Sequence, residues 1–160
     1  MDSDLLLKGK YTFRAGSRKV VMVKKSVESL RHVVMKALLW ALYLPTYNRL
    51  QVEVPIGYRY KPDLVQNGPD DIQFWAEAGS VGSQKLRRVL KRFPHTHFAL
   101  ATWGGPLDSM IARVARQAHG MSRMAPIDVI GFPVDADGRF IDDRGTIRIS
   151  HDDLNWQRIH

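Results

Sequence analysis

One apolar stripe between Ser26 and Pro45 constrains the fold of this chain more than any other feature of the sequence. Apolar residues recur in this segment at spacings of three and four, the period of one face of an α-helix. They are Val27, Leu30, Val33, Val34, Ala37, Leu38, Ala41 and Leu42. Ser26 is suited to an N-cap, and Pro45 ends the pattern. The sequence therefore predicts a helix that is deeply buried, above all in its second half, where Leu39, Trp40 and Tyr43 widen the apolar surface.

Strand-like and helical segments alternate around this helix. Alternating or continuous apolar runs predict strands, at 5–13, 19–24, 49–54, 58–65, 72–77, 97–102, 127–132 and 146–150. Helical periodicity returns at 83–92 and 106–119, and 135–138 has the composition of a tight turn. Helices that separate strands imply a mixed sheet with helices packed on it. We expect one α/β domain over residues 1–160, a length sufficient for a single hydrophobic core.

Charge is unevenly distributed along the chain. The formal net charge is +8, and 17 of the 24 basic residues but only 8 of the 16 acidic ones lie in positions 1–100. A basic surface attracts polyanions, so nucleic acid is an expected partner, although an ordinary solvated surface would have the same composition. The chain has no cysteine, which excludes thiolate metal sites and cysteine nucleophiles. It has no apolar run long enough to span a membrane and no basic start of a secretory signal, so we expect a cytoplasmic protein.

Two carboxylates fall on neighbouring predicted strands. Asp63 lies in the 58–65 segment and Glu77 ends the 72–77 segment. Side chains on adjacent strands can converge on one cation, and Mg²⁺ prefers hard oxygen ligands while keeping several of its waters. We therefore expect Asp63 and Glu77 to hold Mg²⁺ or Mn²⁺. The alternative is a strand-end aspartate and a turn-flanking glutamate that are both solvated.

Five segments carry a resemblance to a known family, in this order along the chain. They are Arg31-His32-Val33-Val34-Met35-Lys36-Ala37-Leu38-Leu39-Trp40, Lys61-Pro62-Asp63-Leu64, Trp75-Ala76-Glu77-Ala78-Gly79, Lys85-Leu86-Arg87-Arg88 and Phe98-Ala99-Leu100-Ala101-Thr102-Trp103. From about Lys8 to Val114 the chain resembles the YaeQ family of the PD-(D/E)XK nuclease superfamily. The resemblance implies a restriction-endonuclease-like α/β fold, with an αβββαβ core and a mixed central sheet flanked by helices.

The same resemblance implies catalytic roles for Glu28, Asp63, Glu77 and Lys85. The superfamily's usual lysine lies two residues after the second acid, where this chain has Gly79. Lys85 on the following helix is the candidate for a relocated lysine, and Lys61 is a second one. The first helix of the fold often contributes an acid to the metal site, here Glu28. An acid at a helix start also stabilises the helix dipole without any catalytic role.

Basic residues crowd the predicted helix at 83–92. Together with Lys61 they are the expected nucleic-acid-binding residues, because such side chains contact phosphates without reading sequence: Arg87, Arg88, Lys91 and Arg92. His95 and His97 could share a strand face, but no third zinc ligand is near them in the sequence.

Three functions remain open at this point. The first is a magnesium-dependent nuclease that hydrolyses phosphodiesters. The second is a catalytically inactive nucleic-acid- or protein-binding module on the same fold, which Gly79 favours. The third is a basic domain whose partner is a protein, including a second copy of the chain in a homodimer.

Overall fold

The structure is a computed structural model that describes residues 9–160, and it is built on a six-stranded sheet in the order β3-β4-β5-β6-β7-β8. The strands β5, β6 and β7 are parallel to one another, and the other neighbours are antiparallel, so the sheet is mixed as predicted. The six strands are β3 (Gln51–Val52), β4 (Leu64–Asn67), β5 (Ile72–Ala78), β6 (His97–Trp103), β7 (Ile127–Phe132) and β8 (Asn155–Ile159). A separate antiparallel hairpin consists of β1 (Lys10–Ala15) and β2 (Arg18–Val23).

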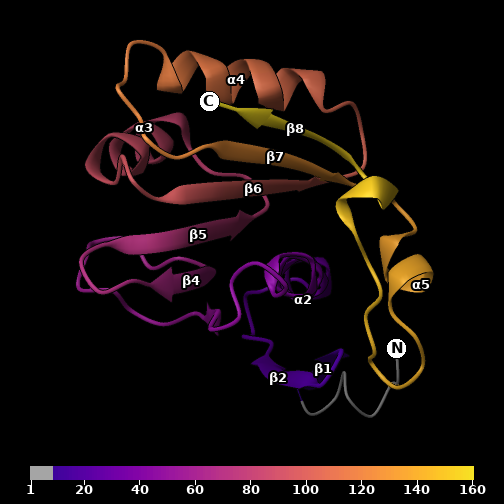
Figure 1. The fold of residues 1–160 in the computed structure, drawn as a ribbon. Helices are drawn as coiled ribbons and strands as arrows, with labels where there is room; N and C mark the ends of the chain where they lie inside the picture. The colour runs from indigo at the N-terminus through magenta and orange to yellow at the C-terminus, as the bar shows by residue number, and fades with distance from the viewer. Residues whose placement is uncertain (1–8) are drawn as a thin grey trace.

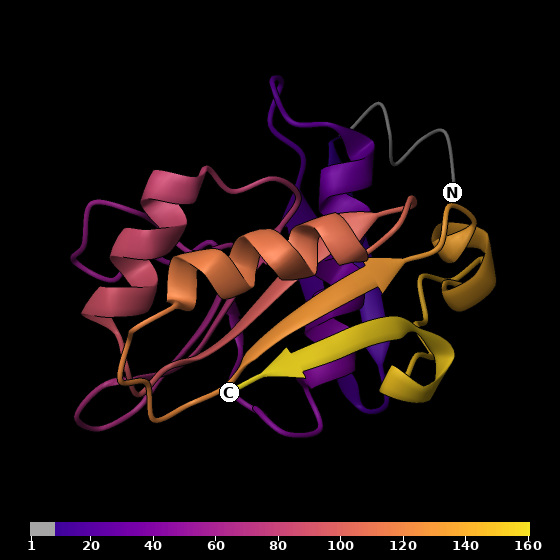
Figure 2. The same ribbon diagram turned by 90° about the horizontal axis from the view of Figure 1, so that it is seen from above.

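Helices cover both faces of the six-stranded sheet (Figures 1 and 2). The long helix α2 (Leu30–Tyr43) packs on one face, between the sheet and the β1–β2 hairpin. On the other face lie α3 (Ser83–Arg92) and α4 (Asp108–Ala118), which contact each other. The short helices α5 (Ala136–Phe140) and η1 (His151–Asp153) lie in the connection between β7 and β8.

Two hydrophobic clusters fill the space between these layers. Along β5, Phe74 and Ala76 face α2, whereas Trp75 faces α3, because successive side chains of a strand point to opposite faces. Every residue of α2 from Val33 to Tyr43 is buried, which confirms the predicted deep burial of this helix. The sheet is thus covered on both sides, and its parallel centre consists of near-continuous apolar strands.

The order of elements α2-β3-β4-β5-α3-β6 is the αβββαβ arrangement expected from the sequence. The predicted bounds of α3 and β7 agree with the structure residue for residue, and β5 extends one residue beyond its prediction. The prediction at 5–13 falls partly on residues 1–8, which lie outside the described part of the chain.

The start of α2 differs from the prediction. Its N-cap is Ser29, whose hydroxyl accepts a hydrogen bond of 3.1 Å from the backbone N–H of His32, so Ser26 does not cap the helix. Val27 precedes the helix and is 95% exposed. Val27 fits the helical period of apolar residues, but Ser29 is the stronger N-cap signal. Its side chain accepts a hydrogen bond from the N–H three residues later, as N-cap residues do.

The extended segments also differ in length. The strand predicted at 58–65 begins only at Leu64, and the one predicted at 49–54 has two residues. The segment 146–150 forms only isolated bridges, at Thr146 and Ile147, and the last strand of the sheet is β8. The predicted turn at 135–138 is the start of helix α5. These errors occur where the local pattern is weak and the structure depends on its tertiary context.

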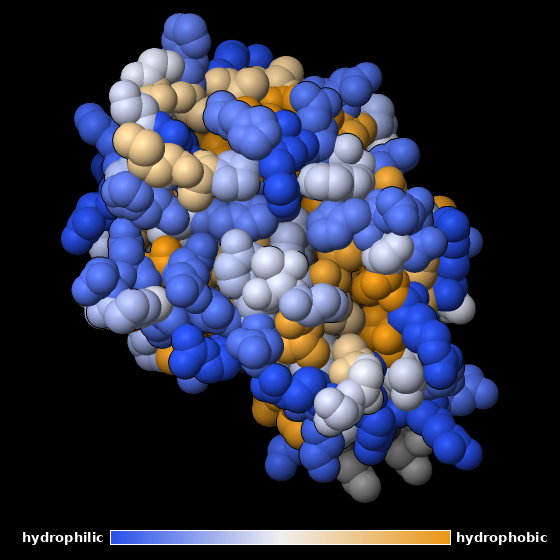
Figure 3. Space-filling view, viewed as in Figure 1, coloured by the Kyte–Doolittle hydropathy of each residue, from blue (hydrophilic) through white to orange (hydrophobic). Residues whose placement is uncertain are grey.

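Hydrophilic residues predominate on the face of the molecule shown in Figure 3, and its apolar residues gather mainly toward the lower right. Six large hydrophobic side chains of the described residues are exposed: Val21, Val23, Val27, Met124, Val134 and Trp156. Within residues 9–160 no helix combines the length and apolar character that crossing a membrane requires.

Candidate active site

Asp63 and Glu77 come together because of strand register. Leu64 of β4 pairs with Ala76 of β5 in antiparallel register, so the preceding residue, Asp63, lies opposite Glu77. Directly opposed residues have Cβ atoms about 5 Å apart. Asp63 is further fixed by the backbone N–H of Ala78, which donates a hydrogen bond of 2.8 Å to its Oδ2. The structure therefore brings together the two acids singled out in the sequence.

The two carboxyls repel each other in a largely buried environment. Burial and the charge of Asp63 raise the pKa of Glu77 to about 7, against the opposing effects of Lys85 and Trp75. Glu77 is only 7% exposed. Burial alone would raise the pKa of Asp63 as well, but hydrogen bonds from His32 and the Ala78 N–H outweigh it and lower that pKa. One acid is thus held ionised while the other keeps its proton to neutral pH.

Lys85 lies at this pair. Its Nζ is 3.3 Å from Glu77 Oε1, and it sits 5.1 Å from the centre of the Tyr60 ring. The same Glu77 oxygen accepts a hydrogen bond of 2.9 Å from the indole N–H of Trp75. Lys85 is in the first turn of α3, so the helix that follows the second acid supplies a cation where Gly79 cannot.

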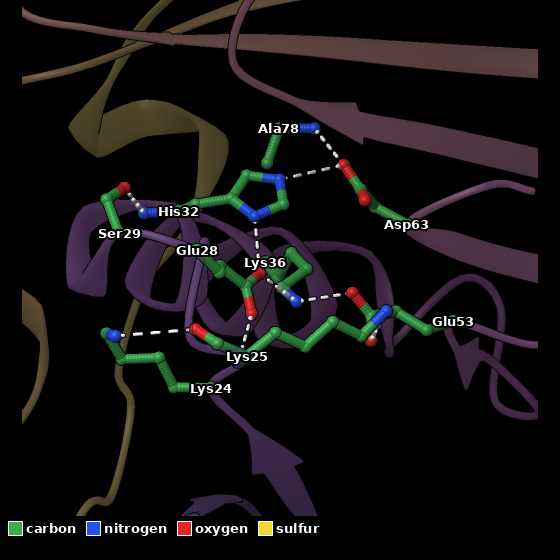
Figure 4. Close-up of polar contacts among 9 residues, drawn as sticks. All are labelled: Lys24, Lys25, Glu28, Ser29, His32, Lys36, Glu53, Asp63 and Ala78. Atoms are coloured by element: carbon green, nitrogen blue, oxygen red, sulfur yellow. Dashed lines mark hydrogen bonds and ion pairs between the residues drawn. The ribbon is translucent and has the colours of Figure 1, made fainter. Parts of the chain in front are cut away.

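His32 connects the pair to the start of α2 (Figure 4). Its Nε2 is 3.3 Å from Asp63 Oδ2, and its Nδ1 is 2.5 Å from Glu28 Oε2. A ring whose two nitrogens both face carboxylates is best satisfied as an imidazolium. Accordingly the hydrogen bond to Asp63 raises the pKa of His32, although burial opposes this.

A buried lysine continues this chain of charges away from Asp63 (Figure 4). Lys36 is 1% exposed, and its Nζ lies 2.6 Å from Glu28 Oε2 and 2.7 Å from Glu53 Oε1. Burial alone would lower the pKa of Lys36 and raise that of Glu28, but their mutual contact and those with Glu53 and His32 outweigh burial in both cases.

Glu53 reaches Lys36 through an uncommon backbone conformation. Its φ of 53° is the one positive value at a non-glycine residue among residues 9–160. An L-residue in the left-handed region costs roughly 1 kcal/mol, and such strain tends to cluster at functional sites. The Glu53 N–H also donates a hydrogen bond of 2.9 Å to the carbonyl of Asp63, which places the network beside the carboxylate pair.

The other predicted site residues are distributed differently. Glu28 precedes the helix rather than lying in its first turn, and it meets the pair through His32. Lys61 is exposed in the loop before β4, where it shares no strand face with Asp63. Among the exposed basic residues of α3, Arg88 points toward the site, since its Nη1 is 3.5 Å from the Tyr60 hydroxyl.

The remaining basic residues of α3 lie away from the carboxylate pair. Arg87 reaches toward α4, where its Nη1 is 3.5 Å from the carbonyl of Gln117, and it lines a pocket there together with Lys91. The guanidinium of Arg92 lies over the ring of Phe93. The predicted nucleic-acid-binding residues therefore divide between two sides of α3.

Metal ligation at this site would rest on two side chains. Within residues 9–160 no group of three or more His, Asp or Glu side chains is arranged to hold a metal ion. Asp63 Oδ2 accepts hydrogen bonds from His32 and the Ala78 N–H, and Glu77 Oε1 contacts Trp75 and Lys85. The other oxygen of each carboxyl has no N–H donor among the described residues. Each carboxyl thus retains one oxygen for its neighbour or for a cation.

Sequence reasoning missed His32, Lys36 and Glu53 as parts of the site. The available signal was the spacing of four between Glu28, His32 and Lys36, which places them on one side of a helical segment. Lys36 within a continuous apolar run was a second signal, because a lysine is almost never fully buried unless it is paired.

Comparison with solved structures identifies the fold. No protein-family model and no curated protein sequence matches the chain. Two crystal structures align over 88% of it: a YaeQ protein from Pseudomonas syringae, with a TM-score of 0.61 and 16% identity, and one from Xanthomonas axonopodis pv. citri, with a TM-score of 0.58 and 15% identity. The chain has the fold of these YaeQ proteins. The alignments cover 81% and 82% of the respective YaeQ chains. At 16% and 15% identity, the likeness to YaeQ proteins establishes the fold of the chain. Its chemistry has to be argued from the residues of the candidate site.

Proposed function

We propose that the protein is a magnesium- or manganese-dependent phosphodiesterase of the PD-(D/E)XK class that acts on nucleic acid. One observation carries the proposal: the half-buried Asp63 and the buried Glu77 oppose each other on neighbouring segments of the sheet, with the Lys85 ammonium 3.3 Å from Glu77. A strongly perturbed pKa at such a pair is typical of a functional site.

The donor set fits a hard divalent cation. Mg²⁺ is usually bound by one or two carboxylates and retains several waters, with substrate phosphates completing its coordination. Asp63 and Glu77 supply two carboxylates, and their mutual repulsion is the kind of unfavourable interaction that a bound cation relieves. When bound, the cation would lower the pKa of a coordinated water and offset charge on the phosphate.

The chain's own residues would perform the remaining tasks. Asp63 and Glu77 hold the cation, and Lys85 places a fixed positive charge next to the phosphate undergoing attack. His32 and Glu28 act as positioning residues, because they fix the rotamer of Asp63. Arg88, exposed on the site's side of α3, gives the phosphate backbone a further contact.

Metal binding is the primary test of this function. Mn²⁺ titration by calorimetry should show a saturable site in the wild type, and the variant combining Asp63→Asn with Glu77→Gln should abolish it. Lys85→Met should retain the metal site, because Lys85 is not a ligand. In a nuclease assay with Mg²⁺ on single- and double-stranded DNA and on RNA, Lys85→Met should lower kcat by about 100-fold or more.

Two outcomes would separate the alternatives. Metal binding and nucleic-acid binding without turnover on any of these substrates would indicate the catalytically inactive binding module. Absence of a saturable site at millimolar Mn²⁺ would remove the metal-dependent enzyme altogether. Exposed Lys19 on β2 offers a matched control, since Lys19→Met should change neither metal affinity nor turnover.

A further inference from the structure

A cationic pocket lies beside the carboxylate pair, between the end of β5 and helix α4. It has a volume of about 360 Å³. Its polar lining consists of small residues, hydroxyls and two guanidinium groups: Gly79, Ser80, Thr102, Ser109, Arg113 and Arg116. No carboxylate lines it. A pocket with two guanidinium charges, three hydroxyl groups and no acid has the chemistry of an anion site.

The pocket is built by the fold rather than by one flexible segment. Ala78 pairs with Ala101 in parallel register, and the Gly79 N–H donates a hydrogen bond of 2.9 Å to the Ala101 carbonyl, so Gly79 and Thr102 lie side by side at the carboxyl ends of β5 and β6. Ligands in α/β sheets bind at such strand ends.

Helix α4 supplies the other wall. Ser109, Arg113 and Arg116 are spaced by four and three residues, which places them on one face of the helix. Arg113 is half-buried and donates a hydrogen bond through its Nη1 to the carbonyl of Val81, which ties the loop after β5 to α4. Arg116 is exposed, and it forms no ion pair among the described residues. Its charge is therefore available to a ligand.

The distance between this pocket and the carboxylates is short. Gly79 follows Glu77 by two residues, a separation of about 7 Å along a strand. The backbone of Ala78, which lies between them, donates its N–H to Asp63. An anion in the pocket and an anion at the carboxylate pair would thus be neighbours, and adjacent phosphates along one nucleic-acid strand have this relationship.

We propose that this pocket binds a second phosphate of the nucleic-acid strand whose scissile phosphate lies at Asp63 and Glu77, an assignment that rests on the proposed function. The strand then runs from the carboxylate pair across the end of β6 to α4. The phosphate is either a terminal 5′-phosphate or an internal phosphodiester, since both present anionic non-bridging oxygens to the guanidinium groups. The sequence predicts phosphate contacts for basic residues of α3 and indicates no function for α4.

The test compares Arg116→Gln with Arg49→Gln, a matched control. Arg49 is exposed at the opposite end of β4, where its N–H donates to Gln66. Binding of one single-stranded oligonucleotide, with a 5′-phosphate or a 5′-hydroxyl, is measured by fluorescence anisotropy in EDTA from 50 to 200 mM salt. Arg116→Gln should weaken binding about threefold or more and reduce the salt slope by about 0.7, and Arg49→Gln should change neither. A loss confined to the 5′-phosphorylated strand supports a terminal phosphate, and an equal loss for both supports an internal one.

Several results would overturn the assignment, and they separate it from the proposed function. If both variants bind like the wild type while the wild type binds and cleaves nucleic acid, the pocket is not a phosphate site but the nuclease stands. If the wild type binds no oligonucleotide in EDTA, the pocket assignment falls, and if it also cleaves none with Mg²⁺, the proposed function falls as well. Mn²⁺ titration of Arg116→Gln should match the wild type, which confirms that any loss arises in the pocket and not in the metal site.

Discussion

The imidazole of His32 lies with its Nε2 3.3 Å from Oδ2 of Asp63, so the start of α2 is tied to the candidate active site. This hydrogen bond raises the pKa of His32, whereas its burial opposes the rise. A group with a raised folded-state pKa contributes stability below its unfolded pKa, about 6.5, and loses it as the pH rises through the folded value.

We predict that His32→Gln lowers the free energy of unfolding by about 1 kcal/mol relative to the wild type at pH 5.5. The difference between the two proteins should be smaller at pH 9. Urea denaturation of both proteins at the two pH values, in EDTA, measures the difference. A gap between the proteins that widens toward high pH would contradict an ion pair between His32 and Asp63.

The ionised Glu77 side chain should destabilise the folded state, and a neutral side chain at this position should remove that destabilisation. Its pKa is raised to about 7 by burial first and by Asp63 second, so the folded state becomes less stable as the pH rises from about 4.3 to 7. Glu77→Gln should therefore stabilise the metal-free protein at pH 8 by about 1–3 kcal/mol and leave it nearly unchanged at pH 4. Denaturant unfolding at both values tests this, and equal effects at the two would argue against the raised pKa. The same substitution should abolish Mn²⁺ binding, as expected where a site is optimised for function over stability.

Lys36 should be required for folding stability rather than for chemistry. Its ammonium is buried between Glu28 and Glu53, and removing one partner of a buried ion pair leaves an uncompensated charge. We expect Lys36→Met to lower the free energy of unfolding by about 3–5 kcal/mol. Lys10→Met, at an exposed position of β1, should change it by less than about 0.5 kcal/mol. Thermal and urea unfolding distinguish these values, and similar effects for the two lysines would refute the buried network.

A second buried network should control acid stability. Asp128 is fully buried and receives hydrogen bonds from Tyr43 (2.6 Å), His97 (2.7 Å) and Arg158 (2.8 Å). Burial would raise the pKa of Asp128, but these contacts outweigh it and hold that pKa well below its usual range. Its stabilisation is therefore present above about pH 4 and is lost as the pH falls further.

Asp128→Asn should lower the unfolding free energy by about 3 kcal/mol at pH 7 and flatten its decline in acid. Asp70→Asn, at an exposed loop position, is the control and should do neither. Because the network lies on the α2 side of the sheet between β7 and β8, metal binding by the Asp128 variant should equal that of the wild type. An acid-unfolding curve that keeps the wild-type steepness would show that other carboxylates dominate.

The elements with strong periodic patterns were predictable from local chemistry. The stripe that became α2, the basic amphipathic helix α3 and the apolar strands β5 and β7 each carry a signal that neighbouring residues reinforce. The proximity of Asp63 and Glu77 could be expected from their places on neighbouring predicted strands, and the register of β4 with β5 sets them opposite each other. Strand β8 was not predictable in this way. Its residues are mostly exposed, and only pairing with β7 makes the segment a strand.

The sequence by itself determined the order of elements from α2 to β6, the burial of α2 and the placement of two carboxylates on neighbouring segments of the sheet, since each depends on residues near in the chain or on alternation along a strand. Only the tertiary structure decided that His32 meets Asp63 across 31 positions, that Lys36 is buried between Glu28 and Glu53, and that Arg113 and Arg116 line a pocket beside Gly79. Such contacts require loop closures whose outcome depends on the packing of the whole sheet. A polar residue within a helix shows that it needs a partner, but the fold selects which partner it meets.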